Sequence, residues 1–316
     1  MNDYEVLIGD CRETLKTLPA QSINTCVTSP PYFGLRDYGH EGQMGAEPTP
    51  DDFVAAMVEV FREVRRVLRD DGTVWLNLGD SYAANRSYQV SDGKHQSHDF
   101  GKSNASRVPQ GLKQKDLIGI PWRVAFALQA DGWYLRQDII WHKPNPMPES
   151  VTDRCTKSHE YIFMLSKSPK YYYDHEAVKE PAVCPRKRGP AEHGDKISTN
   201  GNAGLSRREP TDTRNRRSVW TVPTKPYKGA HFATFPPALI EPCILAGCPK
   251  GGTVLDPFGG SGTTAGVAVG SGRNAVICEL NPEYVELIAE RVATVSGAAI
   301  DQVAAKKQID IFSEAV

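Results

Sequence analysis

The chain has 316 residues, of which 40% are hydrophobic and 24% charged, as in an ordinary folded protein. This length predicts one large domain or two modest ones. No stretch approaches the ~18 consecutive apolar residues of a membrane span, and the polar start of the chain lacks a signal-peptide core. Seven scattered cysteines without a Cys-x-x-Cys pair argue against a disulfide scaffold or a zinc ribbon. We therefore expect a cytoplasmic protein with reduced thiols and no metal site.

The formal net charge of −1 hides an uneven distribution of charged residues. Residues 85–115 carry six Lys and Arg against two acids, and residues 179–217 carry ten against five. The rest of the chain has 21 basic and 31 acidic residues. An acidic body with two basic segments fits a protein that binds a polyanion locally. Two solvated loops whose charge keeps the protein soluble would give the same pattern.

Strands and helices alternate along the chain. Up to residue 84 we expect a strand at 6–8, a helix to about 18, a strand at 23–28, a helix at 51–68 and a strand at 72–78. After residue 116 we expect a helix at 117–130, strands at 133–141 and 161–165, a helix at 236–246, a strand at 253–255, a helix after 264, a strand at 274–278 and a helix at 283–292. Strands separated by helices predict an α/β fold, a doubly wound and mostly parallel sheet with helices on both faces. The two basic segments lack this periodicity and are predicted to be inserted loops.

A glycine-rich segment, Asp-Pro-Phe-Gly-Gly-Ser-Gly-Thr-Thr at 256–264, stands between an expected strand and an expected helix. Its glycines allow a sharp turn and a close approach of the backbone to a ligand. The free N–H groups at the start of the helix suit a carboxylate or a phosphate. Glu279 ends the next strand about twenty residues later, where a carboxylate can accept hydrogen bonds from ribose hydroxyls. The Gly-x-x-x-x-Gly-Lys-Ser/Thr pattern of a nucleoside triphosphatase is missing.

A second motif, Ser29-Pro30-Pro31-Tyr32, directly follows the expected strand at 23–28. It would lie at the carboxyl edge of the sheet, where such folds form their active sites. The prolines stiffen the turn and remove two N–H donors, so that carbonyl oxygens remain free to accept. Ser29 adds a hydroxyl and Tyr32 an aromatic face. These groups suit the methylation of an exocyclic amine, since acceptors orient the amine while the ring stacks on an extruded base.

Together these motifs resemble those of the class-beta DNA amino-methyltransferases, in which a [Ser/Asp/Asn]-Pro-Pro-[Tyr/Phe] motif precedes the cofactor loop. The resemblance implies a Rossmann-like S-adenosylmethionine-dependent methyltransferase fold with inserted recognition loops. It places Ser29, Pro30, Pro31 and Tyr32 at the catalytic site. It assigns the cofactor to Asp10, Cys11, Phe235, Asp256, Phe258, Gly259, Gly260, Ser261, Gly262, Thr263, Thr264 and Glu279. The catalytic and cofactor-binding domain would comprise 1–84, 116–178 and 218–316, with 179–217 as the target-recognition region and 85–115 as a basic inserted loop.

Serine at position 29 favours N4 of cytosine as the methyl acceptor, because in this family Asp-Pro-Pro-Tyr usually accompanies methylation of adenine N6. Adenine N6 remains the main alternative. An RNA methyltransferase and a DNA-binding homologue without catalysis are weaker ones. We expect double-stranded DNA as the partner. The basic residues proposed to contact it are Arg36, Arg207, Arg208, Arg216 and Arg217. The sequence leaves open a homodimer, a cognate restriction endonuclease, and a bacterial or a phage-infected cell as the setting.

Overall fold

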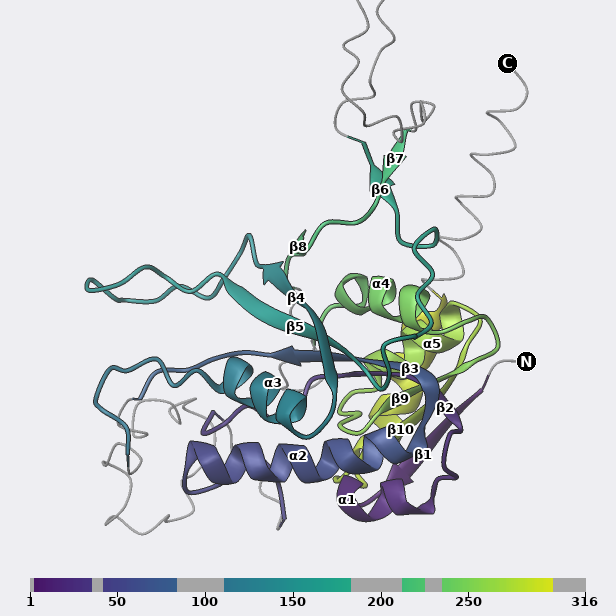
Figure 1. Cartoon of the computed structure of the whole chain (residues 1–316), viewed down its shortest axis with the longest axis horizontal. Coiled ribbons are helices and arrows are strands. Elements are labelled where there is room, and N and C mark those ends of the chain that lie inside the picture. The colour runs from purple at the N-terminus through teal and green to yellow at the C-terminus, as the bar shows by residue number, and fades with distance from the viewer. Residues whose placement is uncertain (1–2, 36–41, 84–110, 183–211, 225–234, 298–316) are drawn as a thin grey trace, which may run out of the picture.

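Figure 1 shows the computed structural model, which describes residues 3–35, 42–83, 111–182, 212–224 and 235–297. Its centre is an eight-stranded sheet with the order β1-β10-β9-β2-β3-β5-β4-β8. The strands are β1 (Tyr4–Ile8), β2 (Ile23–Thr28), β3 (Leu68–Leu78), β4 (Tyr134–His142), β5 (His159–Ser166), β8 (Val219–Thr221), β9 (Thr253–Asp256) and β10 (Asn274–Glu279). All neighbours pair in parallel except β3 with β5 and β5 with β4. The prediction of a mostly parallel α/β sheet is confirmed.

Helices cover both faces of the sheet, as Figure 1 shows. They are α1 (Cys11–Thr14) with the 3₁₀ turn Leu15–Thr17, α2 (Pro50–Val67), α3 (Ile120–Ala130), α4 (Pro237–Gly247) and α5 (Thr263–Gly270), and residues 284–297 are also helical. One hydrophobic core joins α1, α2 and α3 to the sheet, and a second joins α4, α5 and the last helix to it. This two-core arrangement is the doubly wound architecture that alternating strands and helices predict.

Two element boundaries differ from the predicted ones for local reasons. The helix expected from 117 begins at Ile120, because Gly119 takes a left-handed conformation (φ +78°) immediately before it. The helix expected up to Leu18 narrows into a 3₁₀ turn after Thr14. Leu18 is extended (φ −79°, ψ 140°), the conformation favoured before a proline, here Pro19.

The parallel strands place the loops that follow them along one edge of the sheet. Because β1, β10, β9, β2 and β3 all run in the same direction, the segments that follow them emerge side by side. Both sequence motifs belong to these segments, since 29–32 follows β2 and 257–262 follows β9. Although more than 200 residues separate them in sequence, β2 and β9 are hydrogen-bonded neighbours.

The predicted inserts leave the core at well-defined points. At the first, the backbone N–H of Ala83 donates to Asp116 (2.8 Å) and that of Lys115 to Ala83 (2.8 Å). At the second, β6 (Glu180–Pro181) pairs antiparallel with β7 (Thr213–Arg214) in a separate small ribbon. The interiors of both inserts, 84–110 and 183–211, lie outside the described residues. In the part of the chain that the structure describes, no helix is long and apolar enough to cross a membrane.

Candidate active site

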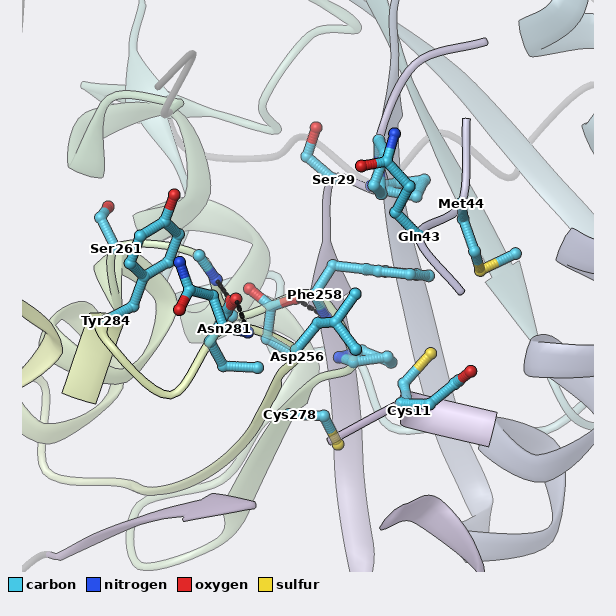
Figure 2. Close-up of a pocket in the computed structure, with 18 of the residues that line it drawn as sticks. Cys11, Ser29, Gln43, Met44, Asp256, Phe258, Ser261, Cys278, Asn281 and Tyr284 are labelled. Carbon is cyan, nitrogen blue, oxygen red and sulfur yellow. Dashed lines mark hydrogen bonds between the residues drawn. The ribbon is translucent and has the colours of Figure 1, made fainter. Parts of the chain in front are cut away.

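A large pocket opens at the carboxyl edge of the parallel strands, with about 1230 Å³ of empty space when its open mouth is included. Figure 2 shows Ser29, Gln43 and Met44 on one side and Ser261, Asn281 and Tyr284 on the other. The predicted site residues that line it are Asp10, Cys11, Ser29, Pro30, Pro31, Tyr32, Phe235, Asp256, Phe258, Gly259, Gly260, Ser261, Thr263 and Glu279. The pocket thus brings the two sequence motifs together in one cavity.

The glycine loop follows β9 closely because its glycines fit where side chains would not. A Cβ on Gly259 would lie 3.0 Å from the Cβ of Ile277 and 3.1 Å from the carbonyl oxygen of Cys278. Gly262 has φ +81° and begins α5, and a Cβ there would come within 2.9 Å of Ile288. Gly262 does not line the pocket. Its conformation turns the chain so that α5 starts at the pocket wall.

Glu279 joins the glycine loop to the end of β10. Its carboxylate accepts the backbone N–H of Gly260 (2.7 Å) and that of Asn281 (2.9 Å). Burial raises the pKa of this carboxyl, while the two backbone donors act in the opposite direction. The carboxylate also lines the pocket. Its remaining lone pairs can therefore accept hydrogen bonds from the hydroxyls of a ligand.

If Glu279 holds the S-adenosylmethionine that the sequence resemblance implies, its replacement with alanine is expected to weaken binding of this cofactor roughly 10- to 100-fold, because hydrogen bonds to a charged group contribute about 1.5–3 kcal/mol. Isothermal titration calorimetry measures this change. Glu286→Ala, which removes an exposed carboxylate from the helix that follows, should leave the affinity unchanged. Equal affinities for Glu279→Ala and the unmodified chain would remove Glu279 from the cofactor site.

Asp256 links the glycine loop to the Ser29–Tyr32 turn. Its buried carboxylate accepts the hydroxyl of Thr28 (2.6 Å) and that of Thr264 (2.6 Å), and also the backbone N–H of Phe258 (3.1 Å). Burial raises the pKa of this carboxyl. Thr28 directly precedes Ser29, so this carboxylate fixes the start of the turn against the loop. Thr264 is used in this contact and does not line the pocket.

The loop after β1 forms another wall of the pocket. Asp10 caps α1 by accepting the backbone N–H of Arg12 (2.9 Å) and forms an ion pair with the Arg12 guanidinium, which lowers the pKa of the carboxyl. Burial raises the pKa of the Cys11 thiol to about 12 and that of Cys278 to about 11. Both side chains are therefore uncharged thiols at neutral pH, suited to packing against an apolar ligand surface.

The Ser29–Tyr32 turn is fixed by hydrogen bonds and by close packing against β3. The Tyr32 hydroxyl donates to Glu160 (2.7 Å), and the backbone N–H of Gly34 donates to the carbonyl of Gly45 (2.7 Å). A Cβ on Gly79, just after β3, would lie 2.5 Å from Cε2 of Tyr32. Glycine at 79 therefore lets the tyrosine ring lie directly against the end of β3.

Gly79→Ala is expected to lower turnover about tenfold or more, because the added methyl group must displace the Tyr32 ring. Gly297→Ala is a matched control for loss of a glycine, since a Cβ there meets nothing within 4 Å. Steady-state methylation assays on both variants measure the effect. Wild-type turnover in Gly79→Ala would show that the observed ring position is not needed.

The described arginines proposed to contact DNA already have partners in the protein. Arg217 forms an ion pair with Glu180 (2.7 Å), which also binds Arg214 (2.8 Å). The Arg216 guanidinium lies 4.5 Å from the centre of the Trp220 ring. These contacts hold the segment between the β6–β7 ribbon and β8 in place. The other three, Arg36, Arg207 and Arg208, lie outside the described residues.

Several residues that line the pocket were not predicted. Asn281 and Tyr284 follow Glu279 closely, so their position after a strand end was a usable signal. Gln43 and Met44 come from a segment without a recognisable motif, and tertiary contacts bring that segment to the turn. Within the described ranges, no group of three or more His, Cys, Asp or Glu side chains could hold a metal ion.

The model of a protein family described as DNA methylase, N6_N4_Mtase, matches residues 23–290. The chain belongs to this family. This DNA methylase is 50% identical over 295 residues to the type II methyltransferase M.SmaI of Serratia marcescens, covering 92% of this chain and 91% of that protein. It is 52% identical over 285 residues to M.XycI of Xanthomonas campestris pv. cyanopsidis, covering 90% and 86%. The resemblance to the amino-methyltransferases is confirmed.

Solved structures agree with the fold of this DNA methylase. PvuII DNA methyltransferase, described as cytosine-N4-specific, matches with a TM-score of 0.62 at 19% identity, covering 95% of this chain and 94% of that one. A putative DNA modification methylase from Thermus thermophilus, complexed with S-adenosyl-L-methionine, matches with a TM-score of 0.59 at 24% identity, covering 93% and 94%. At these identities the likeness establishes the methyltransferase fold.

Proposed function

We propose that this DNA methylase transfers the methyl group of S-adenosylmethionine to the exocyclic N4 amine of cytosine in duplex DNA. The observation that carries this proposal is the single pocket shared by the Ser29–Tyr32 turn and the glycine loop. Serine at position 29 favours cytosine over adenine. The cytosine-N4-specific description of the PvuII enzyme, which has the same fold, supports the same choice.

S-adenosylmethionine is the methyl donor of this family, and the pocket suits it chemically. Glu279 offers a carboxylate to the ribose hydroxyls, and the apolar surfaces of Phe258 and Tyr284 suit the adenine ring. The glycine loop and the start of α5 present backbone N–H groups to the charged methionine end. When bound, the cofactor supplies an electrophilic methyl group on a sulfonium.

The turn would position the amine that receives the methyl group. In a duplex this amine is base-paired, so the cytosine must leave the stack to reach the pocket. The Pro30 carbonyl and the Ser29 hydroxyl would accept hydrogen bonds from the amine and direct its lone pair towards the methyl carbon. Tyr32 would stack on the base, an interaction worth about 1–3 kcal/mol. Catalysis would thus consist mainly of positioning and electrostatics.

Direct transfer without a covalent enzyme intermediate fits the cysteines near the site. Cys26 lies on β2, three residues before the turn, and burial raises its pKa well above the ordinary value. Cys11 and Cys278 have raised pKa values for the same reason. Since the thiolate is the nucleophilic form of cysteine, none of these three is prepared to attack a base.

The polyanion partner in this proposal is double-stranded DNA. Residues 179–217 would form most of the target-recognition region, with help from 85–115, and their positive charge would supply phosphate contacts. The relatives named above are type II methyltransferases of bacteria. We therefore place this chain in a bacterial cytoplasm, beside a cognate restriction endonuclease whose site it would protect.

Sequencing of host DNA tests the proposal. The chain is expressed in a bacterial host without amino-methyltransferases of its own, and the DNA is sequenced by a single-molecule method that detects N4-methylcytosine and N6-methyladenine. We expect one short sequence in which a cytosine carries the methyl group at nearly every occurrence. Modification confined to adenines would overturn the base assignment. DNA without either modification, from cells containing the folded protein, would contradict DNA methylation as the function.

A further inference from the structure

The hydroxyl group of Tyr32 is tied to residues far away in sequence. It donates to Oε2 of Glu160 at 2.7 Å, and Oδ1 of Asn77 lies 3.4 Å from it. Glu160 is the second residue of β5, and Asn77 is the penultimate residue of β3, the strand paired with β5. The tyrosine of the catalytic turn is therefore fixed by the antiparallel part of the sheet. The cofactor loops stand on the parallel part.

Glu160 is itself held as a charged acceptor. Its Oε1 forms an ion pair with Lys143, and both side chains are largely buried, with exposed fractions of 14% and 19%. Lys143 also lies 4.2 Å over the ring of Trp141, which adds a cation–π contact. Asn77 donates to Oε2 of Glu160 (3.3 Å) and to the carbonyl of Tyr161 (3.0 Å). These contacts hold the Glu160 carboxylate in the orientation that accepts the hydrogen bond from Tyr32.

The stability of the fold does not by itself account for the largely buried Lys143–Glu160 ion pair. Burying two charges costs several kcal/mol per ion, and apolar side chains of similar volume often stabilise a protein as well or better. The pair instead provides a fixed acceptor for the Tyr32 hydroxyl at one end of the ring, and the missing side chain at Gly79 leaves the ring room to lie against the end of β3. A ring held in place by its hydroxyl would receive a base with less loss of conformational freedom.

We propose that Glu160 is a positioning residue that acts through the Tyr32 hydroxyl, and that Lys143 keeps Glu160 in place. This inference rests on the proposed function, in which Tyr32 stacks on the extruded base. Glu160 would contact neither the cofactor nor the reacting atoms. Its contribution would be to the rate of methyl transfer from the fully bound complex, with little effect on the binding of S-adenosylmethionine.

A double-mutant cycle tests this role. The rate of a single turnover at saturating DNA and cofactor is measured for Tyr32→Phe, Glu160→Ala and the double variant. Each single variant should lose roughly tenfold in rate, the scale of one charge-assisted hydrogen bond. The double variant should be no slower than the slower single variant, because both changes remove the same contact. Losses that multiply in the double variant would overturn the proposal.

Three further measurements complete the test. Glu160→Gln, which keeps an oxygen for the Tyr32 hydroxyl, should recover part of the rate. If Glu160→Ala does not fold, Glu160→Leu, which removes the acceptor but fills the space with an apolar side chain, replaces it in the cycle. Cofactor affinity should stay within about twofold of the unmodified chain. Glu63→Ala, which removes a partly buried carboxylate paired with Arg66 on α2, should leave the rate unchanged. An unchanged rate in both Glu160 variants would overturn the proposal.

Measuring Tyr32→Ala beside the cycle separates this inference from the proposed function. If Tyr32→Ala abolishes turnover while Glu160→Ala does not change it, only the positioning role of Glu160 fails. If Tyr32→Ala itself leaves turnover unchanged, the proposed catalytic turn fails, and the positioning role of Glu160 fails with it.

Discussion

Tyr32→Ala is expected to lower kcat/KM for DNA methylation about 10- to 100-fold, since base–aromatic stacking contributes about 1–3 kcal/mol. The alanine removes the stacking surface and also the hydrogen bond to Glu160. Steady-state methylation of mapped substrate DNA measures the loss. The affinity for S-adenosylmethionine, measured by calorimetry, should stay within about twofold, because the residues assigned to the ribose and the methionine end lie in other loops.

The control for this variant is Tyr134→Ala. Tyr134 is exposed and begins β4, so it lies at the edge of the sheet opposite the pocket. We expect unchanged turnover and unchanged cofactor affinity in this control. An equal loss of cofactor binding in Tyr32→Ala would place Tyr32 in the cofactor site, and wild-type turnover would remove it from the base pocket.

Asp256→Ala is expected to impair folding stability and catalysis together. The substitution leaves the hydroxyls of Thr28 and Thr264 and the N–H of Phe258 without their shared acceptor in a buried site. Unsatisfied buried groups cost about 1–3 kcal/mol each, so a loss of roughly 2–4 kcal/mol is expected after local relaxation. Thermal unfolding measures the stability, and calorimetry should show weaker S-adenosylmethionine binding in the variant that remains folded.

The variant Asp256→Asn shows whether the effect of Asp256→Ala comes from the lost hydrogen bonds or from the lost side-chain volume. Its amide oxygen can still accept one threonine hydroxyl, so stability and cofactor affinity should fall between those of the alanine variant and the unmodified chain. Asp153→Ala removes an exposed carboxylate paired with Lys115 and should change neither the stability nor the cofactor affinity. A normal Tm and normal cofactor affinity in Asp256→Ala would contradict the role of Asp256 in joining the glycine loop to the Ser29–Tyr32 turn.

The parallel half of the molecule could be predicted from sequence because its signals are local. An apolar strand followed directly by Pro30 and Pro31, or by the glycine loop, marks a strand end, and parallel pairing brings such ends to one edge. The same reasoning failed for Gln43 and Met44, which belong to no motif. The segment that contains Gln43 and Met44 is joined to the turn by the Gly34–Gly45 hydrogen bond, which no local sequence pattern predicts.

The charge pattern of the sequence did not predict the partners of individual arginine side chains. The sequence indicated arginines for phosphate contacts, whereas Arg217 is paired with Glu180 in the structure and Arg216 lies over Trp220. The Tyr32–Glu160 hydrogen bond joins residues 128 positions apart and depends on the register of β3 with β5. The sequence did not fix this register, because both strands are buried along most of their length and so lack the polar alternation that separates one register from the next.

The central claim is that the Ser29–Tyr32 turn and the glycine loop form one site for methylation of cytosine N4. The most direct measurement incubates the purified chain with unmodified DNA and S-adenosylmethionine labelled in its methyl group, and then identifies the digested nucleosides by mass spectrometry. We expect labelled N4-methylcytosine, formed about 10- to 100-fold less efficiently by Tyr32→Ala. Labelled N6-methyladenine as the only product would contradict the base assignment. No labelled nucleoside, from protein that binds the cofactor and DNA containing the mapped site, would contradict DNA methylation itself.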